Sequence, residues 1–92
     1  MAIEVRIPTI LRTYTAGAKT VNGEGATLEE LLGDLESRHP GLKDRLTDES
    51  GVRRFINVYL NDEDVRFLGG LGTPVADGDT ITVLPAVAGG AG

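Results

Sequence analysis

The fold of this chain is decided by one stretch, Thr27-Leu-Glu-Glu-Leu-Leu-Gly-Asp-Leu-Glu-Ser-Arg38. Its first four residues match a capping box, in which the Thr27 hydroxyl and the Glu30 carboxylate reciprocally satisfy free amide groups of the first helical turn. Its leucines recur at the i, i+3, i+4, i+7 spacing of an amphipathic helix. The face predicted to be buried consists of Leu28, Leu31, Leu32 and Leu35.

The end of this helix is marked by residues that favour termination. Arg38 and His39 suit the negative end of the helix dipole. Pro40-Gly41 then stops the helix, because proline lacks the amide hydrogen and glycine readily reverses the chain. A helix end is therefore a sufficient explanation for His39, the only histidine of the chain. One more helical turn is expected over residues 42–47, followed by a loop over residues 48–51.

Two short strands are predicted before the helix. Apolar and polar side chains alternate over residues 3–7, and this period of two is typical of a strand with one buried face. Residues 9–17 are expected to form a turn that leads to a second strand over residues 18–21. We expect Asn22-Gly-Glu-Gly25 to close the hairpin, because asparagine and glycine tolerate the positive φ angles of tight turns.

The strands expected after the helix complete the sheet. Residues 54–60 are rich in β-branched and aromatic side chains. Residues 65–68 are expected to add a short strand or bridge, and residues 80–84 form the last strand. This order predicts an α+β fold, in which a mixed sheet of about five strands packs on one main helix. Leu60 shares one face of its strand with Ile56 and Val58. The strand residues predicted to pack against the helix are Ile3, Val5, Ile7, Ile56, Val58, Ile81 and Val83.

The composition excludes several classes of function. The 92 residues are the size of one domain. The net charge of −5 argues against nucleic acid as a partner, because phosphate binding requires basic surfaces. The absence of cysteine excludes disulfides, thiolate catalysis and cysteine-ligated metals. No apolar run approaches the roughly 20 residues that span a bilayer, and no signal peptide is visible. We expect a cytoplasmic protein without a membrane partner.

No group of side chains in the sequence suggests catalysis or metal binding. The acidic turn Asp62-Glu63-Asp64 lacks the spaced oxygen ligands of an EF-hand loop. Gly69-Gly-Leu-Gly72 lacks the lysine and the strand–helix context of a phosphate-binding loop. Asp77-Gly-Asp79 is typical of a tight turn. The sequence therefore predicts no catalytic residue, no metal site and no cofactor.

The least ordinary part of the chain is its end, Pro85-Ala-Val-Ala-Gly-Gly-Ala-Gly92. It has no charged or large side chain, and alanine and glycine alone cannot build a core. We expect a folded domain over residues 1–85 and a flexible tail over residues 86–92. Small side chains give such a tail a thin cross-section, which the narrow active site of another protein could admit. The terminus is therefore the candidate for chemistry.

Several segments of the chain resemble one protein family. These segments are Ile7-Pro-Thr-Ile-Leu-Arg12, Asn57-Val-Tyr-Leu-Asn61, Asn61-Asp-Glu-Asp-Val-Arg-Phe67, Asp77-Gly-Asp-Thr-Ile-Thr-Val-Leu-Pro85 and Gly89-Gly90. Together with the order of strands and helix, they resemble the ubiquitin-like, β-grasp sulfur carriers of the ThiS/MoaD family, in particular the CysO-type carriers of cysteine biosynthesis. The resemblance covers nearly the whole chain and implies a β-grasp fold.

The resemblance implies a protein substrate and not an enzyme. In the family, an E1-like enzyme uses ATP to adenylate the terminal glycine, and sulfur then replaces AMP to form a thiocarboxylate. In this chain the implied residue is Gly90, preceded by Gly89. The implied sulfur acceptor is a synthase of the cysteine synthase type or the thiosugar synthase type. The alternatives are a β-grasp interaction module and a ubiquitin-like protein modifier, neither of which transfers sulfur.

The chain departs from the family pattern because Ala91-Gly92 follow the diglycine. Some carriers of this class have a short extension that a JAMM-type zinc metalloprotease removes, which implies cleavage between Gly90 and Ala91. Activation of Gly92 itself is an alternative, since Ala-Gly is nearly as thin as Gly-Gly. A remnant of a tag is a third, although two residues do not resemble a tag.

A docking face for the activating enzyme is predicted on the outer side of the sheet. It combines side chains that alternate opposite the core residues with one apolar residue of the tail, since exposed apolar patches tend to mark interfaces. The predicted partner-binding residues are Phe55, Tyr59, Leu84 and Val87. The alternative is that Phe55 and Tyr59 complete a second small cluster beneath the long loops.

Overall fold

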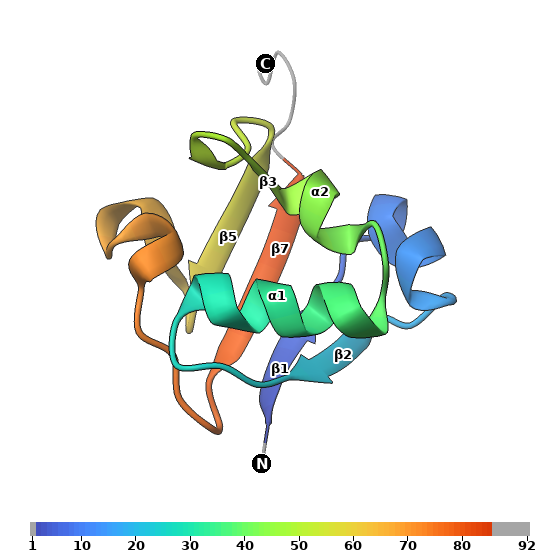
Figure 1. Ribbon diagram of the computed structural model, residues 1–92, viewed down its shortest axis with the longest axis horizontal. Coiled ribbons are helices and arrows are strands. Elements are labelled where there is room, and N and C mark those ends of the chain that lie inside the picture. Colours follow the sequence, from blue (N-terminus) through green and yellow to red (C-terminus); the bar gives the residue numbers. More distant parts are fainter. Residues whose placement is uncertain (1, 86–92) are drawn as a thin grey trace.

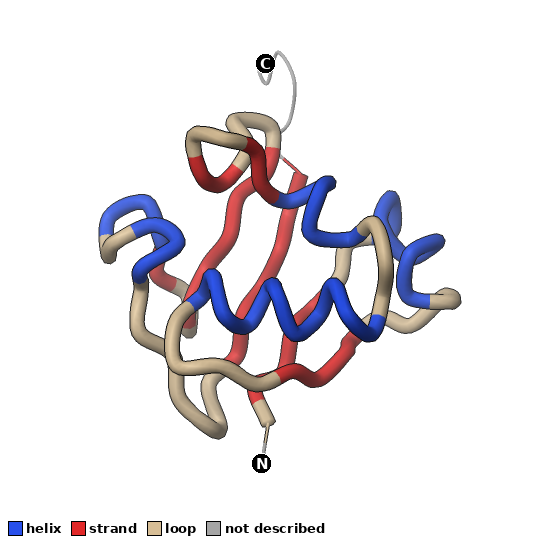
Figure 2. The backbone as a smooth tube through the Cα atoms, in the orientation of Figure 1, coloured by secondary structure: helices blue, strands red, loops and turns tan. Residues whose placement is uncertain are grey.

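The computed structural model describes residues 2–85, in which one long helix lies across one face of a five-stranded sheet (Figure 1). The strands of the sheet are β1 (Ile3–Arg6), β2 (Thr20–Gly23), β5 (Ile56–Leu60), β6 (Glu63–Asp64) and β7 (Thr80–Pro85). Their order is β2-β1-β7-β5-β6. The central strand β7 runs parallel to β1 and antiparallel to β5, so the sheet is mixed, as predicted. Figure 2 shows the main helix crossing in front of the strands, with the other helical segments at the margins of the sheet.

The main helix, α1 (Leu28–Arg38), begins at the predicted cap. The Thr27 hydroxyl accepts a hydrogen bond from the N–H of Glu30 at 3.2 Å. The Glu30 carboxylate accepts the N–H of Ala26 at 3.0 Å and not that of Thr27, so this half of the capping box is displaced by one residue. After the helix, Gly41 has a φ of 94°, which allows the chain to reverse into a short helix, α2 (Leu42–Leu46).

The predicted helix face and the predicted strand faces form one core. Figure 1 shows α1 lying across the strands, and all four of its predicted leucines are buried. The inward strand residues are buried as well, except Leu60, which is only partly buried next to the turn into β6. Further core side chains come from segments that are too short to show a repeating spacing of apolar residues. They are Leu11, Leu42, Leu46, Val65 and Val75.

The connection between β1 and β2 is more ordered than the predicted turn. Thr9–Thr15 form a 3₁₀ helix, η1, which ends at Ala16 and Gly17 in positive-φ conformations of 55° and 87°. β2 then begins at Thr20, two residues later than expected.

The turn predicted at Asn22-Gly-Glu-Gly25 was wrong in its first half. Asn22 and Gly23 belong to β2, where Gly23 pairs with Ile3 at the end of the ladder with β1. A Cβ atom on Gly23 would lie 2.8 Å from Cδ1 of Leu31. Glycine stands here because α1 approaches β2 closely, and not because the chain turns.

A short hairpin replaces the loop predicted over residues 48–51. Its strands are β3 (Thr47–Asp48) and β4 (Gly51–Val52). The Asp48 carboxylate accepts the N–H of Ser50 at 2.8 Å, which stabilises the turn between them. The chain turns again before β5, which therefore begins at Ile56 and not at residue 54.

The strand or bridge predicted for residues 65–68 was also wrong. Val65–Phe67 form a 3₁₀ helix, η2, and a second one, η3, follows at Gly70–Gly72. The reason is a cap at the last residue of β6: the Asp64 carboxylate accepts the N–H of Arg66 at 2.9 Å, as N-cap residues do.

Candidate functional site

The functional part predicted from the sequence begins where the chain leaves the sheet. β7 ends at Pro85, which lies opposite Ile56 at the last position of the β5–β7 ladder. Figure 1 shows this end of β7 between the β3–β4 hairpin and η1. Four predicted site residues lie outside the described residues: Val87, Gly89, Gly90 and Ala91.

Two of the predicted partner-binding residues lie together on the outer face of the sheet. Tyr59 is opposite Thr82 in the β5–β7 ladder. Leu84, two residues further along β7, is 46% exposed. A shallow hollow of about 310 Å³, here called the outer-face hollow, is lined by Arg6, Tyr59, Asp62, Thr82 and Leu84. The structure thus brings Tyr59 and Leu84 together on the outer face, near the end of β7.

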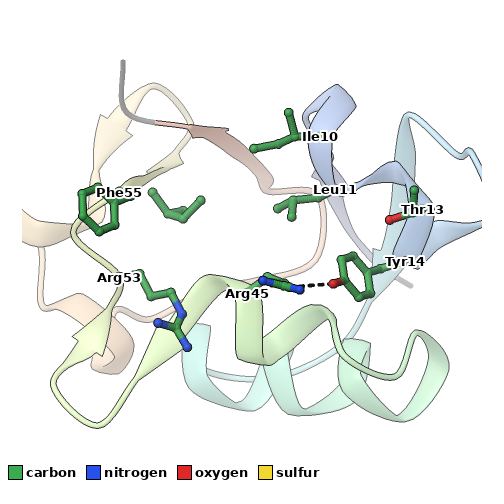
Figure 3. Close-up of a pocket in the computed structure, with 8 residues that line it drawn as sticks. Ile10, Leu11, Thr13, Tyr14, Arg45, Arg53 and Phe55 are labelled. Atoms are coloured by element: carbon green, nitrogen blue, oxygen red, sulfur yellow. Dashed lines mark hydrogen bonds between the residues drawn. The ribbon is translucent and has the colours of Figure 1, made fainter. Parts of the chain in front are cut away.

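Phe55 lies on a different surface. Because β5 begins at Ile56, the alternation of the strand does not carry Phe55 onto the outer face. Its side chain is 72% exposed and lines a groove at the end of the sheet (Figure 3). An exposure of 72% also means that Phe55 does not complete a buried cluster beneath the loops.

This groove, here called the sheet-end groove, combines apolar and positively charged walls. It encloses about 490 Å³ and is lined by Ile10, Leu11, Thr13, Tyr14, Arg45, Arg53, Phe55 and Ile56. Figure 3 shows Ile10 and Phe55 on its two sides. Sequence reasoning missed Ile10, Arg45 and Arg53, because no local signal shows that η1, α2 and the segment before β5 meet in space.

Contacts between the two α-helices support one wall of the groove. The Glu36 carboxylate of α1 accepts the N–H of Gly41 at 2.9 Å and that of Lys43 at 3.0 Å. These hydrogen bonds lower the pKa of Glu36, and the bond from Gly41 contributes most. The positive charge of Lys43 lowers this pKa further. They attach the start of α2 to α1, and α2 carries Arg45.

The acidic turns serve the fold. The Asp79 carboxylate accepts the N–H of Ala76 at 2.9 Å and the side-chain amide of Asn61 at 3.1 Å. Over residues 2–85, no three histidine, cysteine, aspartate or glutamate side chains are grouped as metal ligands. In the same range, no helix has the length and apolar character needed to cross a membrane.

A mixed sheet packed on one main helix, with the first and last strands side by side and parallel at its centre, defines a β-grasp protein of the ubiquitin-like class. Solved structures confirm this fold. A chain of the Amycolatopsis orientalis BexX/CysO complex superposes with a TM-score of 0.91 at 62% identity, over 96% of this chain and 99% of that one.

The sequence matches the ThiS family over residues 5–90, and the chain belongs to that family. The sulfur carrier protein CysO of Mycobacterium tuberculosis is 54% identical over 93 residues, which cover 98% of this chain and 100% of the relative. The small archaeal modifier protein 3 of Haloferax volcanii is 39% identical over 67 residues, 73% of each chain. The resemblance to ThiS-type and CysO-type proteins is confirmed.

Proposed function

We propose that this protein is a sulfur carrier whose C-terminal glycine is adenylated by an E1-like enzyme and converted to a thiocarboxylate. One observation carries the proposal. The family match continues past Pro85, the last residue of the sheet, and ends at residue 90, the second glycine of the pair. The tail is thus part of what this chain shares with the family. The 54% identity to a protein named as a sulfur carrier supports the same conclusion.

The proposed chemistry takes place on the chain terminus. The carboxylate of Gly90 attacks the α-phosphorus of ATP, which forms an acyl-adenylate and releases pyrophosphate. Sulfide then attacks the acyl carbon, and AMP leaves with the electrons of the broken C–O bond. Glycine suits both steps because it has no Cβ to crowd the attacking groups. The carrier is therefore a co-substrate, and its folded domain supplies recognition.

We propose a synthase of the cysteine synthase type or the thiosugar synthase type as the sulfur acceptor. The name of the mycobacterial relative and the BexX/CysO complex support transfer between a carrier and a second protein. Because adenylation consumes ATP, we also propose that the carrier acts in the cytoplasm.

We propose that the activating enzyme docks around the end of β7. Tyr59 and Leu84 line the outer-face hollow, and Phe55 is 72% exposed at the neighbouring end of the sheet. Exposed apolar side chains that surround one point of the surface are typical of an interface. Val87 follows Pro85 by two residues and would complete this docking surface from the tail.

We propose that Ala91-Gly92 are removed by a JAMM-type metalloprotease before activation. The family match ends at residue 90, which supports Gly90 as the activated residue. Five residues from Pro85 allow Gly90 to reach at most roughly 18 Å from the sheet. The two extra residues would lengthen this reach by roughly 7 Å and place the wrong carbonyl at the site of adenylation.

Intact-mass spectrometry tests the function and the processing together. The full-length protein and a form that ends at Gly90 are incubated separately with an E1-like enzyme, ATP and sulfide. The Gly90 form is expected to gain the mass difference between one sulfur and one oxygen atom, while the full-length form remains unchanged. Equal gain on the full-length form would contradict the processing step alone. No gain on either form would contradict the carrier function.

A second candidate function is favoured by the archaeal relative, whose name identifies it as a modifier protein. In that case the activated terminus would form an amide with lysine side chains of other proteins. Denaturing electrophoresis of the reaction mixture with added protein acceptors distinguishes the two, because conjugates migrate as larger species that resist thiols. Conjugates without any thiocarboxylate would favour the modifier. A β-grasp interaction module predicts neither product.

A further inference from the structure

The sheet-end groove exposes apolar side chains that the fold does not use. Ile10 is 63% exposed and Phe55 is 72% exposed, on opposite sides of the groove (Figure 3). The groove is floored by Leu11 and Ile56, which are buried members of the core. An apolar side chain entering between Ile10 and Phe55 would therefore meet apolar surface on three sides. This geometry fits a bulky apolar residue of a partner.

The two arginines of the groove are held in a way that leaves their outer nitrogens available. Nε of Arg45 donates to the Tyr14 hydroxyl at 2.6 Å, and its guanidinium lies 5.5 Å from the centre of the Tyr14 ring. Nε of Arg53 donates to the carbonyl of Asp44 at 2.7 Å. Within residues 2–85, the arginines that form ion pairs are others: Arg6, Arg38 and Arg66.

A guanidinium that is anchored through Nε still presents its two terminal nitrogens as a planar fork. This fork matches the two oxygens of a carboxylate, and anchoring reduces the conformational entropy lost on binding. The chain as a whole has a net charge of −5, so this pair of arginines is a positive region on an acidic protein. Charge complementarity therefore selects an acidic partner segment at this position.

We propose that the sheet-end groove docks an acidic segment of the activating enzyme. Two carboxylates of that segment pair with Arg45 and Arg53, and an apolar residue between them inserts between Ile10 and Phe55. This inference rests on the proposed function, because it takes the activating enzyme as the partner. Ile56 lines the groove and lies opposite Pro85, so the groove is close to the point from which an enzyme would take up the tail.

The other possible occupants fit the groove less well. Residues 86–92 of the chain's own tail contain no acidic side chain that could pair with the two arginines. Folding the tail back would also order several residues, and the conformational entropy lost would not be offset by an ion pair from their side chains. A second copy of the chain brings the same net charge of −5, so the two copies repel each other.

Two neighbouring arginines provide a matched test. Arg53→Glu changes a residue of the groove, whereas Arg54→Glu makes the same change in charge at an exposed residue that does not line the groove. Every carrier in this test, including the unmodified protein, ends at Gly90, the form that we propose is activated. Its adenylation is measured with the E1-like enzyme as a function of carrier concentration. Arg53→Glu is expected to raise KM about tenfold with kcat unchanged, and Arg54→Glu to change KM less than about twofold. The difference should shrink as salt is added.

Thermal unfolding of each variant shows whether Arg53→Glu disturbs folding. If it does, the groove is tested with two other variants, Arg45→Glu and Ile10→Ser. Both are expected to raise KM without changing kcat. Equal KM values for Arg53→Glu and Arg54→Glu, with normal adenylation of the unmodified protein, would overturn the docking site and leave the carrier function intact. Failure of the unmodified protein to be adenylated would overturn both. Nuclear Overhauser contacts between the tail and Ile10 in the free protein, or a dimer that Arg53→Glu dissociates, would also overturn the proposal.

Discussion

Pro85 lies directly opposite Ile56 at the last position of the β5–β7 ladder. Ile56 lines the sheet-end groove, and Leu84, the residue before Pro85, lines the outer-face hollow. The chain therefore leaves the sheet between two recessed surfaces, one on the outer face and one at the end. An enzyme that takes up the terminus approaches both surfaces. We therefore expect changes on either surface to weaken binding of the enzyme and to leave the chemical step unchanged.

The first prediction concerns Phe55. Phe55→Asp is expected to fold normally, because the side chain is 72% exposed, and to raise the KM for adenylation about tenfold, or ~1.4 kcal/mol. Phe67→Asp is the matched control, since Phe67 is 87% exposed on η2 and lines none of the recessed surfaces described above. Steady-state kinetics with the E1-like enzyme provide the measurement. A Phe55→Asp protein adenylated at the normal rate would remove Phe55 from the interface.

The second prediction concerns the core. Leu32 is 1% exposed on the buried face of α1, so Leu32→Ala should lower the free energy of unfolding by ~2–5 kcal/mol through lost burial and a residual cavity. Leu84→Ala, at a side chain that is 46% exposed, should cost less. Urea denaturation monitored by circular dichroism measures both. A loss below about 1 kcal/mol for Leu32→Ala would show that the helix face is wrongly assigned.

The third prediction contrasts two glycines. A Cβ on Gly33, in the middle of α1, meets nothing within 4 Å, so Gly33→Ala should stabilise the protein by ~0.5–1 kcal/mol through helix propensity. A Cβ on Gly23 would lie 2.8 Å from Leu31 and 2.9 Å from Leu35. Gly23→Ala should therefore destabilise by ~1–3 kcal/mol through overpacking. Changes of the same sign in urea denaturation would contradict this account of Gly23.

The fourth prediction is a pH dependence at Glu36. Its pKa is lowered in the folded state by the N–H groups of Gly41 and Lys43, so the carboxylate stabilises the fold above its unfolded pKa. That stabilisation is lost as the pH falls through the folded pKa, below the ordinary value of 4.5. Glu36→Gln should therefore lower the melting temperature at neutral pH, with the difference from the unmodified protein shrinking in acid.

Glu49→Gln serves as the control for this prediction, because it removes the same charge from the exposed turn between β3 and β4. Its effect on the melting temperature should be smaller at neutral pH than that of Glu36→Gln. A Glu36→Gln difference that stays constant from neutral to strongly acidic pH would show that the carboxylate does not carry the contact.

The elements that sequence reasoning predicted correctly are those with a local cause. The cap at Thr27, the leucine spacing of α1 and the alternation in the central strands are properties of a few neighbouring residues, and they placed most of the core. The predictions for residues 22–25 and 65–68 failed for different reasons. At Gly23 a tertiary contact, the close approach of α1, outweighed the local preference for a turn. At residues 65–68 the missed signal was local, because the Asp64 carboxylate caps η2, and the Arg66 side chain adds a bond to the carbonyl of Arg53 at 2.8 Å.

The sequence by itself determined the main helix, the strand faces and the segments that together carry the family resemblance, because period, capping and short motifs are properties of consecutive residues. Only the tertiary structure decided that Phe55 separates from Tyr59 and Leu84, and that Ile10, Arg45 and Arg53 surround one groove. These residues come from segments far apart in the chain. Their meeting depends on how α1, α2 and η1 pack on the sheet, and packing of that kind leaves no periodic trace in the sequence.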